Sequence, residues 1–160
     1  MDFNEYIAKV KDRMGKEGYN LKQDNIGNQN ATVGVKGVFK WSWLATKLTI
    51  FITVGTPETI SINTFEEFAI DSVDYAIKNK GGLPRGFQTG IASIAALASN
   101  NVNQDVKEFA QKQPAKHFAA IQLQVVYDLK ENKAYYYEGT PIWGRIYYGY
   151  LKDTIKNLLT

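Results

Sequence analysis

Two neighbouring stretches of alternating apolar residues constrain the fold of this chain most strongly. Residues 48–54 carry Leu, Ile or Val at every second position, and residues 33–43 alternate small or polar residues with Val33, Val35, Phe39, Trp41 and Trp43. Alternation of this kind is typical of strands with one buried face. The link between the stretches is too short for the crossover that a parallel pair needs, which predicts an antiparallel hairpin. We expect both tryptophans to face the core from one strand.

Further segments extend this sheet. The alternation is longest over residues 119–129, and a turn at 130–133 leads into a shorter segment at 134–138. The apolar run at 91–98 fits a strand or a buried helix, and we favour the strand because the run is short and bounded. Asn, Gln and Gly dominate residues 23–30, which is typical of a loop.

Helices are expected at the beginning, in the middle and at the end of the chain, with a short one at 103–113. Each longer helix has an apolar stripe at three-to-four-residue spacing and a polar residue suited to cap its first turn. Glu67 completes a capping box in the central helix, and Pro141 fits the first position of the last helix. The expected N-caps are Asp2, Thr64 and Thr140.

The order of these elements predicts the fold class. Strands and helices are mixed without a regular βα repeat, which favours an α+β fold over a parallel α/β fold. A chain of this length fits a single domain, here residues 1–160, with enough buried surface to fold unaided. We expect a twisted, mostly antiparallel sheet of about five to six strands, packed by N-terminal, central and C-terminal helices.

The lack of cysteine excludes several classes of chemistry. A disulfide framework, a zinc–thiolate site, an iron–sulfur cluster and a cysteine nucleophile all need thiols. His117 is the single histidine, and the chain has no nucleophile-elbow motif, so a Ser–His–Asp triad is disfavoured. We expect no cofactor and no metal.

Charge and hydropathy indicate the compartment and the partners. The 19 basic residues give a net charge of +3 but are scattered, and only three are Arg, the residue that nucleic-acid readers prefer. A nucleic-acid partner is therefore disfavoured. The N-terminal residues lack the apolar segment of a signal peptide, and no apolar run is long enough to span a bilayer. We expect a cytoplasmic protein and no membrane association.

Carboxylates offer a route to metal-dependent chemistry. Asp128 and Lys130 fit the D/E-x-K pattern of nucleases, in which the carboxylate binds Mg²⁺ and the lysine steadies the attacking water. Asp71 and Asp74 lie on neighbouring positions of one helix face. Triplets of the D/E-x-K type arise readily by chance in a chain with this many charges, so a metal-dependent nuclease is the least favoured function.

The segment 81–90, GGLPRGFQTG, is the most distinctive of the chain. Glycine lets backbone N–H groups approach an anion, and an arginine clamps a phosphate or carboxylate. The alternative is structural, since the glycines and the proline also end the central helix. The candidate ligand-binding residues are Gly82, Arg85, Gly86, Gln88 and Thr89.

Tyrosines are abundant near the C-terminus. Three are consecutive at 135–137 and three more lie at 147–150, so they cannot all point to one side of a strand or helix. Some of these rings must reach the surface or an interface, where tyrosine is favoured. The candidate interaction residues are Tyr135, Tyr137 and Tyr148.

Several stretches resemble a known family. Residues 41–46 (WSWLAT), 75–77 with 79–86, 88–90 and 118–121 are similar to a family of short bacterial and archaeal proteins with no known activity. The resemblance therefore implies no catalytic residue. The element order alone is loosely similar to that of type III secretion chaperones, apart from the additional segment 91–113.

Two functions remain open from the sequence besides the least favoured one, the metal-dependent nuclease. The missing catalytic groups and the surplus tyrosine favour a non-enzymatic binding protein that contacts a protein partner or a second copy of itself. The alternative is an anion- or phosphate-binding protein, or an enzyme, that uses the segment 81–90.

Overall fold

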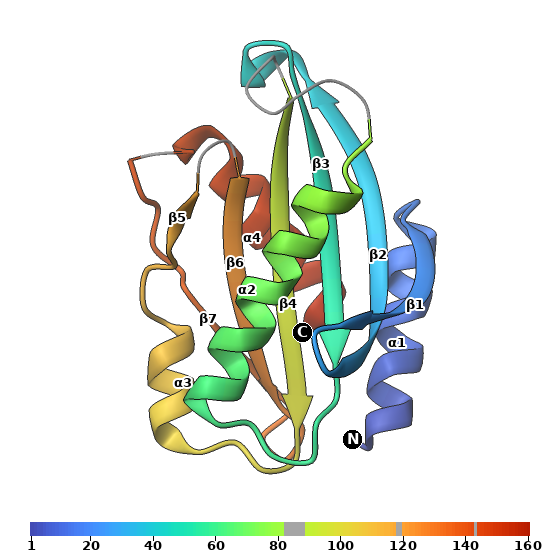
Figure 1. Cartoon of the computed structure of the whole chain (residues 1–160), viewed down its shortest axis with the longest axis vertical. Coiled ribbons are helices and arrows are strands. Elements are labelled where there is room, and N and C mark those ends of the chain that lie inside the picture. The colour runs from blue at the N-terminus through green and yellow to red at the C-terminus, as the bar shows by residue number, and fades with distance from the viewer. Residues whose placement is uncertain (82–88, 118–119, 143) are drawn as a thin grey trace.

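The computed structural model describes residues 1–81, 89–117, 120–142 and 144–160. In this part of the chain one seven-stranded sheet has the order β1–β2–β3–β4–β6, with β5 and β7 both beside β6 (Figure 1). Two strand pairs, β3–β4 and β4–β6, are parallel and the other four are antiparallel. The strands are β1 (Asn20–Ile26), β2 (Gln29–Lys40), β3 (Thr46–Gly55), β4 (Thr89–Ser99), β5 (Lys116–His117), β6 (Ala120–Asp128) and β7 (Lys133–Tyr136).

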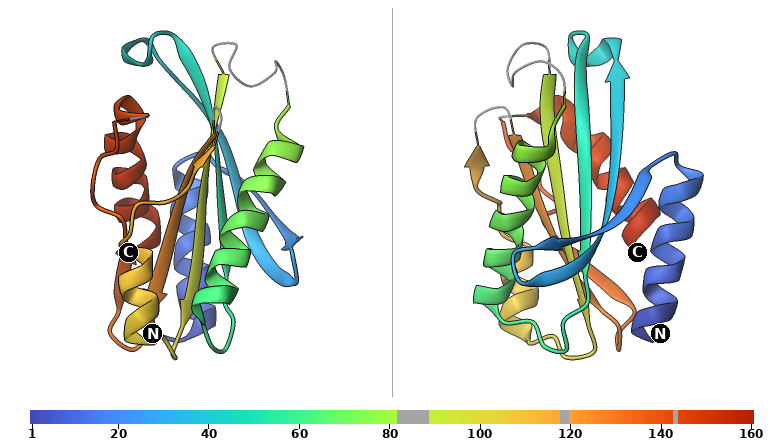
Figure 2. Two further views of the ribbon diagram at one scale, coloured as in Figure 1. Left: turned by 60° about the vertical axis from the view of Figure 1, so that its left-hand side comes forward. Right: turned by 45° about the vertical axis from the view of Figure 1, so that its right-hand side comes forward.

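The helices form a layer on each side of the sheet, as Figure 2 shows. On one side α1 (Phe3–Lys16) and α4 (Arg145–Leu159) contribute to an apolar cluster with β3, β4 and β6. On the other side α2 (Ile62–Asn79) and α3 (Gln104–Ala110) form a second apolar cluster with residues of β1, β2, β4 and β6. The predicted α+β class, with its mostly antiparallel sheet and its N-terminal, central and C-terminal helices, is confirmed.

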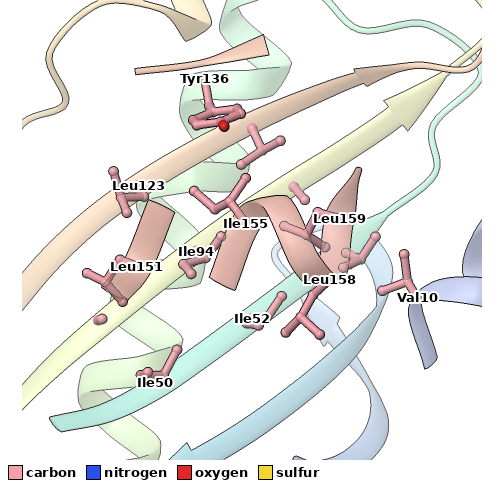
Figure 3. Packing of buried hydrophobic residues seen from close by; sticks show 14 of the residues in the cluster. Val10, Ile50, Ile52, Ile94, Leu123, Tyr136, Leu151, Ile155, Leu158 and Leu159 are labelled. Carbon is pink, nitrogen blue, oxygen red and sulfur yellow. The ribbon is translucent and has the colours of Figure 1, made fainter. Parts of the chain in front are cut away.

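The largest cluster of buried apolar residues includes the inner face of α4. Figure 3 shows Leu151, Ile155 and Leu158 of this helix pointing onto Ile52 and Ile94 of the sheet. All five side chains are at most 2% exposed. Burying an apolar side chain of this size stabilises the fold by about 2 kcal/mol, so α4 is a major source of stability.

The run at 91–98 is a strand, as predicted, and its position explains its composition. β4 lies at the centre of the sheet and is covered by helices on both faces, so alternation is lost. Every residue from Ile91 to Ser99 is buried. Four alanines in this strand are fully buried, and their small size allows helices to approach the sheet closely: Ala92, Ala95, Ala96 and Ala98.

The expected loop at 23–30 is wrong, because most of it is strand β1 and its turn. β1 is the edge strand and its residues are mostly exposed, so polar side chains there cost little. The turn contains Gly27, whose positive φ of 55° favours glycine. A Cβ at Gly27 would also come within 3.0 Å of Cγ of Asp71.

Two of the three predicted helix starts need correction. Asp2 caps α1 as predicted, since its Oδ1 accepts a hydrogen bond from the N–H of Glu5 at 2.8 Å. In contrast, α2 begins after Ser61, whose Oγ accepts from the N–H of Thr64 at 3.1 Å. The last helix begins at Arg145 and not at Pro141, because Gly144 has a φ of 74°, which no right-handed helix contains.

No helix in the described residues is both long enough and apolar enough to pass through a bilayer.

The position of the α2 cap can be tested by substitution. Replacing Ser61 with Ala removes the acceptor for the Thr64 N–H and is expected to lower the free energy of unfolding by about 1 kcal/mol. Glu67→Ala, at the position of the predicted capping box, is expected to change it by about 0.5 kcal/mol or less. Urea denaturation of both variants measures the difference, and a larger loss for Glu67→Ala would contradict the assignment.

Candidate functional site

Most of the predicted anion site lies outside the described residues. Gly82, Arg85, Gly86 and Gln88 belong to the segment 82–88, which the structure does not describe. Thr89 is described: it is half-buried, begins β4 and pairs with Lys47 of β3. The segment 81–90 therefore ends where the parallel strands begin, at the end of the sheet that also carries the β2–β3 hairpin tip.

The three candidate interaction tyrosines do not form one surface. Tyr135 packs on the α2–α3 side of the sheet, whereas Tyr137 and Tyr148 pack on the α1–α4 side. Tyr148 is only 3% exposed, and burial raises its pKa to about 12. Tyr135 and Tyr137 are half-buried, and the Tyr135 hydroxyl donates to Oε2 of Glu131.

Asp128 of the D/E-x-K pattern lies in a buried ion cluster. Its Oδ2 is 2.7 Å from Nζ of Lys107, and its Oδ1 accepts from the N–H groups of Lys130 and Glu131 at 2.9 and 3.1 Å. Lys107 also contacts Oε1 of Glu131 at 2.7 Å. Asp128 therefore fixes α3 and the β6–β7 turn to each other, with both oxygens occupied by the protein's own donors.

Burial and pairing oppose each other in this cluster. Burial alone raises the pKa of Asp128, but the hydrogen bonds from Lys107 and from the two backbone N–H groups hold it below its usual value. Burial likewise lowers the pKa of Lys107, but the two carboxylates raise it overall. Among the residues that the structure describes, no three His, Asp or Glu side chains gather as a metal site would require.

Exposed apolar side chains gather at one end of the molecule. Of the seven large apolar residues that are exposed in the described part of the chain, five belong either to the tip of the β2–β3 hairpin or to the beginning of α4. These are Phe39 (50%), Trp41 (81%), Leu44 (82%), Ile142 (97%) and Ile146 (48%). Gly144, between the two isoleucines, lies against Ile121 at the beginning of β6, so both groups are at the same end of the sheet.

The two tryptophans of the hairpin point in different directions, which corrects the prediction that both face the core. The strand ends at Lys40, and Trp41–Trp43 forms a short 3₁₀ helix, η1, in which residues two apart do not share a face. Trp43 is 3% exposed and packs edge-on against Tyr147 and Tyr150 of α4, at centroid distances of 5.2 and 5.4 Å.

Trp41 remains outside while Trp43 anchors the tip. Nζ of Lys40 lies 4.2 Å from the ring centroid of Tyr150 and 5.1 Å from that of Trp43, which adds a cation–π contact to the anchor. The Trp41 ring contacts only Phe39 edge-on among the described aromatic rings, at 5.3 Å. The contacts of Trp43 and Lys40 therefore fix the hairpin end, and the indole of Trp41 stays exposed in a fixed position.

The backbone of the tip is strained. Leu44 and Ala45 have φ values of 56° and 57°, in the left-handed region, where a residue with a Cβ costs about 1–2 kcal/mol. Strain of this kind is most often found at functional sites. Here it presents the Leu44 side chain, 82% exposed, next to Trp41.

In the folded chain, the end of the sheet with the hairpin tip carries basic but no acidic side chains among the described residues. Four stretches of the sequence contain no acidic residue, and the described parts of each reach the end of the sheet with the tip: 25–57, 75–104, 109–127 and 139–152. Exposed basic side chains at this end come from four elements or their ends, namely Lys47, Lys78, Lys116 and Arg145. The first turns of α1 and α3, at the opposite end, carry Glu5 and Asp105 (Figure 1).

A polar hollow of about 200 Å³ lies elsewhere, between the start of α1 and the ends of β2 and β3. Its lining contains no charged side chain: it includes Asn4, Gln23 and Asn30. Pockets for small molecules are usually about 300–1,000 Å³ in volume. We therefore place the candidate site at the hairpin tip, defined as Phe39, Trp41 and Leu44.

The comparisons with known proteins add no name to this site. No protein-family model, no curated protein and no solved structure matches the chain.

Loss of the buried partner should destabilise the protein. Asp128→Ala leaves Lys107 buried with only the half-exposed Glu131, which is expected to lower the free energy of unfolding by about 3 kcal/mol at pH 7. Because pairing lowers the pKa of Asp128, its contribution is present above pH ~4 and decreases as the pH falls further. Denaturation at pH 7 and pH 3 should therefore show a smaller difference from wild type in acid. Lys130→Ala, an exposed neighbour, is the control.

Relief of the backbone strain should stabilise the tip. Ala45→Gly removes the Cβ penalty but adds freedom to the unfolded chain, so a net gain of about 0.5 kcal/mol is expected. The matched control is Ala8→Gly, at an exposed position of α1, where the same change should cost about 1 kcal/mol. Opposite signs in parallel urea titrations would confirm the strain, and a loss in both variants would refute it.

Proposed function

We propose that the chain is a non-enzymatic binding protein that contacts its partner through the hairpin tip. The observation that carries this proposal is the exposure of Trp41 and Leu44, 81% and 82%, on a strained and firmly anchored base. Exposed apolar clusters of this kind mark contact sites.

The anchor supports the same function. Trp43, Tyr147 and Tyr150 fix the position of the tip, so little conformational freedom is lost when a partner binds. Trp is also the residue most often found at the energetic centre of interfaces. The proposal includes a cytoplasmic location.

The tip replaces the tyrosines as the proposed contact surface. Tyr148 is buried and Tyr135 and Tyr137 are half-buried, whereas Trp41 and Leu44 are 81% and 82% exposed. A second copy of the chain is one partner that the tip could bind, and light scattering of the purified protein measures this directly.

The tip-dependent complex can be tested in a whole-cell extract. The purified chain of 18.0 kDa is added to the extract, and its apparent mass is measured by size-exclusion chromatography. The wild type is expected to move to a larger mass, while Trp41→Ser/Leu44→Ser stays at the mass of the isolated chain. Ile70→Ser, which replaces an exposed apolar residue on α2, should behave as the wild type. Equal behaviour of wild type and tip variant in the extract would exclude a soluble macromolecular partner at the tip.

Anion binding by the segment 81–90 is the second candidate. Thr89 begins β4 beside Lys47, in an acid-free part of the chain, which supports an anionic ligand at this end. A thermal-shift screen with nucleotides, sugar phosphates and carboxylates is the test. A ligand of the proposed site should lose its effect in Arg85→Ala and keep it in Arg145→Ala. A shift that survives unchanged in Arg85→Ala would exclude this site.

A further inference from the structure

The hairpin tip extends past the strands beside it, and this limits which partner can cover it. β2 and β3 pair as far as Lys40 and Thr46, whereas β4 joins β3 only from Thr89, opposite Lys47. Residues 41–45 therefore lie beyond the rest of the sheet, and both views in Figure 2 show the hairpin end projecting from the body. A folded protein covers a projecting side chain only with a pocket of matching shape. A fluid bilayer closes around a projecting side chain without any such match.

The exposed residue types suit the boundary between lipid headgroups and acyl chains. Trp is enriched at this boundary because its ring is apolar while its N–H still finds a polar partner. Leu44 and Phe39 add purely apolar surface beside Trp41. Ile142 and Ile146, at the beginning of α4, supply a second apolar contact at the same end.

The charges favour an anionic surface in one orientation. The segments that cross the tip end carry lysine and arginine but no acidic residue, while Glu5 and Asp105 lie at the other end. Each Lys or Arg close to an anionic bilayer increases affinity about fivefold at physiological salt. The same field repels the acidic end, so the tip faces the membrane and the opposite end faces away.

We propose that the hairpin tip binds the surface of an anionic lipid bilayer, with Trp41 and Leu44 inserted among the headgroups and Lys47 and Arg145 facing the lipid phosphates. The inference rests on the proposed function, because it uses the same surface. The cytoplasmic leaflet is the anionic one in cells. The expectation of no membrane association was based on spanning segments, and insertion of a tip requires none.

Vesicle flotation tests this proposal with two lipid compositions. Vesicles of phosphatidylcholine with about one third phosphatidylserine should carry the protein upward, and vesicles of phosphatidylcholine alone should bind it at least about tenfold less. Raising the salt from about 0.1 M to about 0.5 M should weaken the binding to anionic vesicles, because the charges are then screened. Equal binding to both compositions, or none to either, overturns the proposal.

Two kinds of variant distinguish the contribution of side-chain insertion to vesicle affinity from the contribution of charge. Trp41→Ala/Leu44→Ala should lower the affinity for anionic vesicles at least about tenfold, since two apolar side chains no longer enter the bilayer. Lys47→Gln should lower it about fivefold. The matched controls are Ile70→Ala and Lys130→Gln, which lie outside the tip end and should bind as the wild type does. Circular dichroism of each variant confirms that it is folded.

Indole fluorescence gives a second measurement that does not depend on affinity. Addition of anionic vesicles should shift the emission of the wild type to shorter wavelength, as Trp41 leaves water. The shift should become smaller in Trp41→Phe, which retains the other two tryptophans, Trp43 and Trp143. An unchanged shift in this variant would show that another tryptophan meets the lipid and would overturn the assignment of the tip.

The failure of this inference is distinguishable from the failure of the proposed function. Tip-dependent binding to a protein, a second copy or a single-stranded oligonucleotide, with none to vesicles, overturns the membrane proposal but leaves the tip as a binding surface. If Trp41→Ser/Leu44→Ser matches the wild type both in extract and on vesicles, both proposals fail.

Discussion

Burial of the central strands from both sides is the constraint on which the rest of the structure depends. β3, β4 and β6 carry the two parallel pairings, and the apolar clusters above and below them contain residues from all four helices. Because parallel strands need helical crossovers, α2 and the segment with α3 are placed on one side of the sheet. The first and last helices are then left to cover the other side.

This arrangement determines where the hairpin tip can exist. β2 and β3 still pair at Lys40 and Thr46, one residue beyond the point where β4 joins β3, so residues 41–45 project past the beginning of β4. A free hairpin end would be mobile, but Trp43 fastens it to α4 through two edge-on ring contacts and a lysine above them. The same side chain that stabilises the fold therefore gives Trp41 its fixed and exposed position.

Local patterns predicted most of the fold, and the failures have physical reasons. The hairpin of β2 and β3 and the Asp2 cap depend on periodicity and local hydrogen bonds, which a sequence displays directly. The central strand β4 shows no alternation and was predicted from the short, bounded apolar run alone. β1 was missed because an exposed edge strand tolerates polar residues on both faces. The start of α4 was misplaced because the positive φ of Gly144, and not the proline before it, decides where the helix begins.

The candidate site was harder to predict than the fold. Alternation placed Trp41 in the core because nothing local revealed that the strand ends at Lys40. The acidic residues are scattered along the sequence, and their absence from one end becomes visible only when four separate segments are brought together by the topology. The sequence singled out Asp128 as part of a D/E-x-K pattern. It did not reveal the ion pair with Lys107, because Lys107 lies on a different element, α3, and only the fold brings the two side chains together.

The contact between the two terminal helices has a consequence for synthesis. The Tyr6 hydroxyl of α1 donates to the carbonyl of Leu159 in α4 at 3.0 Å, across a separation of 153 residues. While the ribosome is still translating the middle of the chain, α1 has no partner helix, and the part of the sheet face that α4 will cover stays exposed. Final closure of the core must therefore wait until α4 has left the exit tunnel, and the nascent chain exposes that face to chaperones until then.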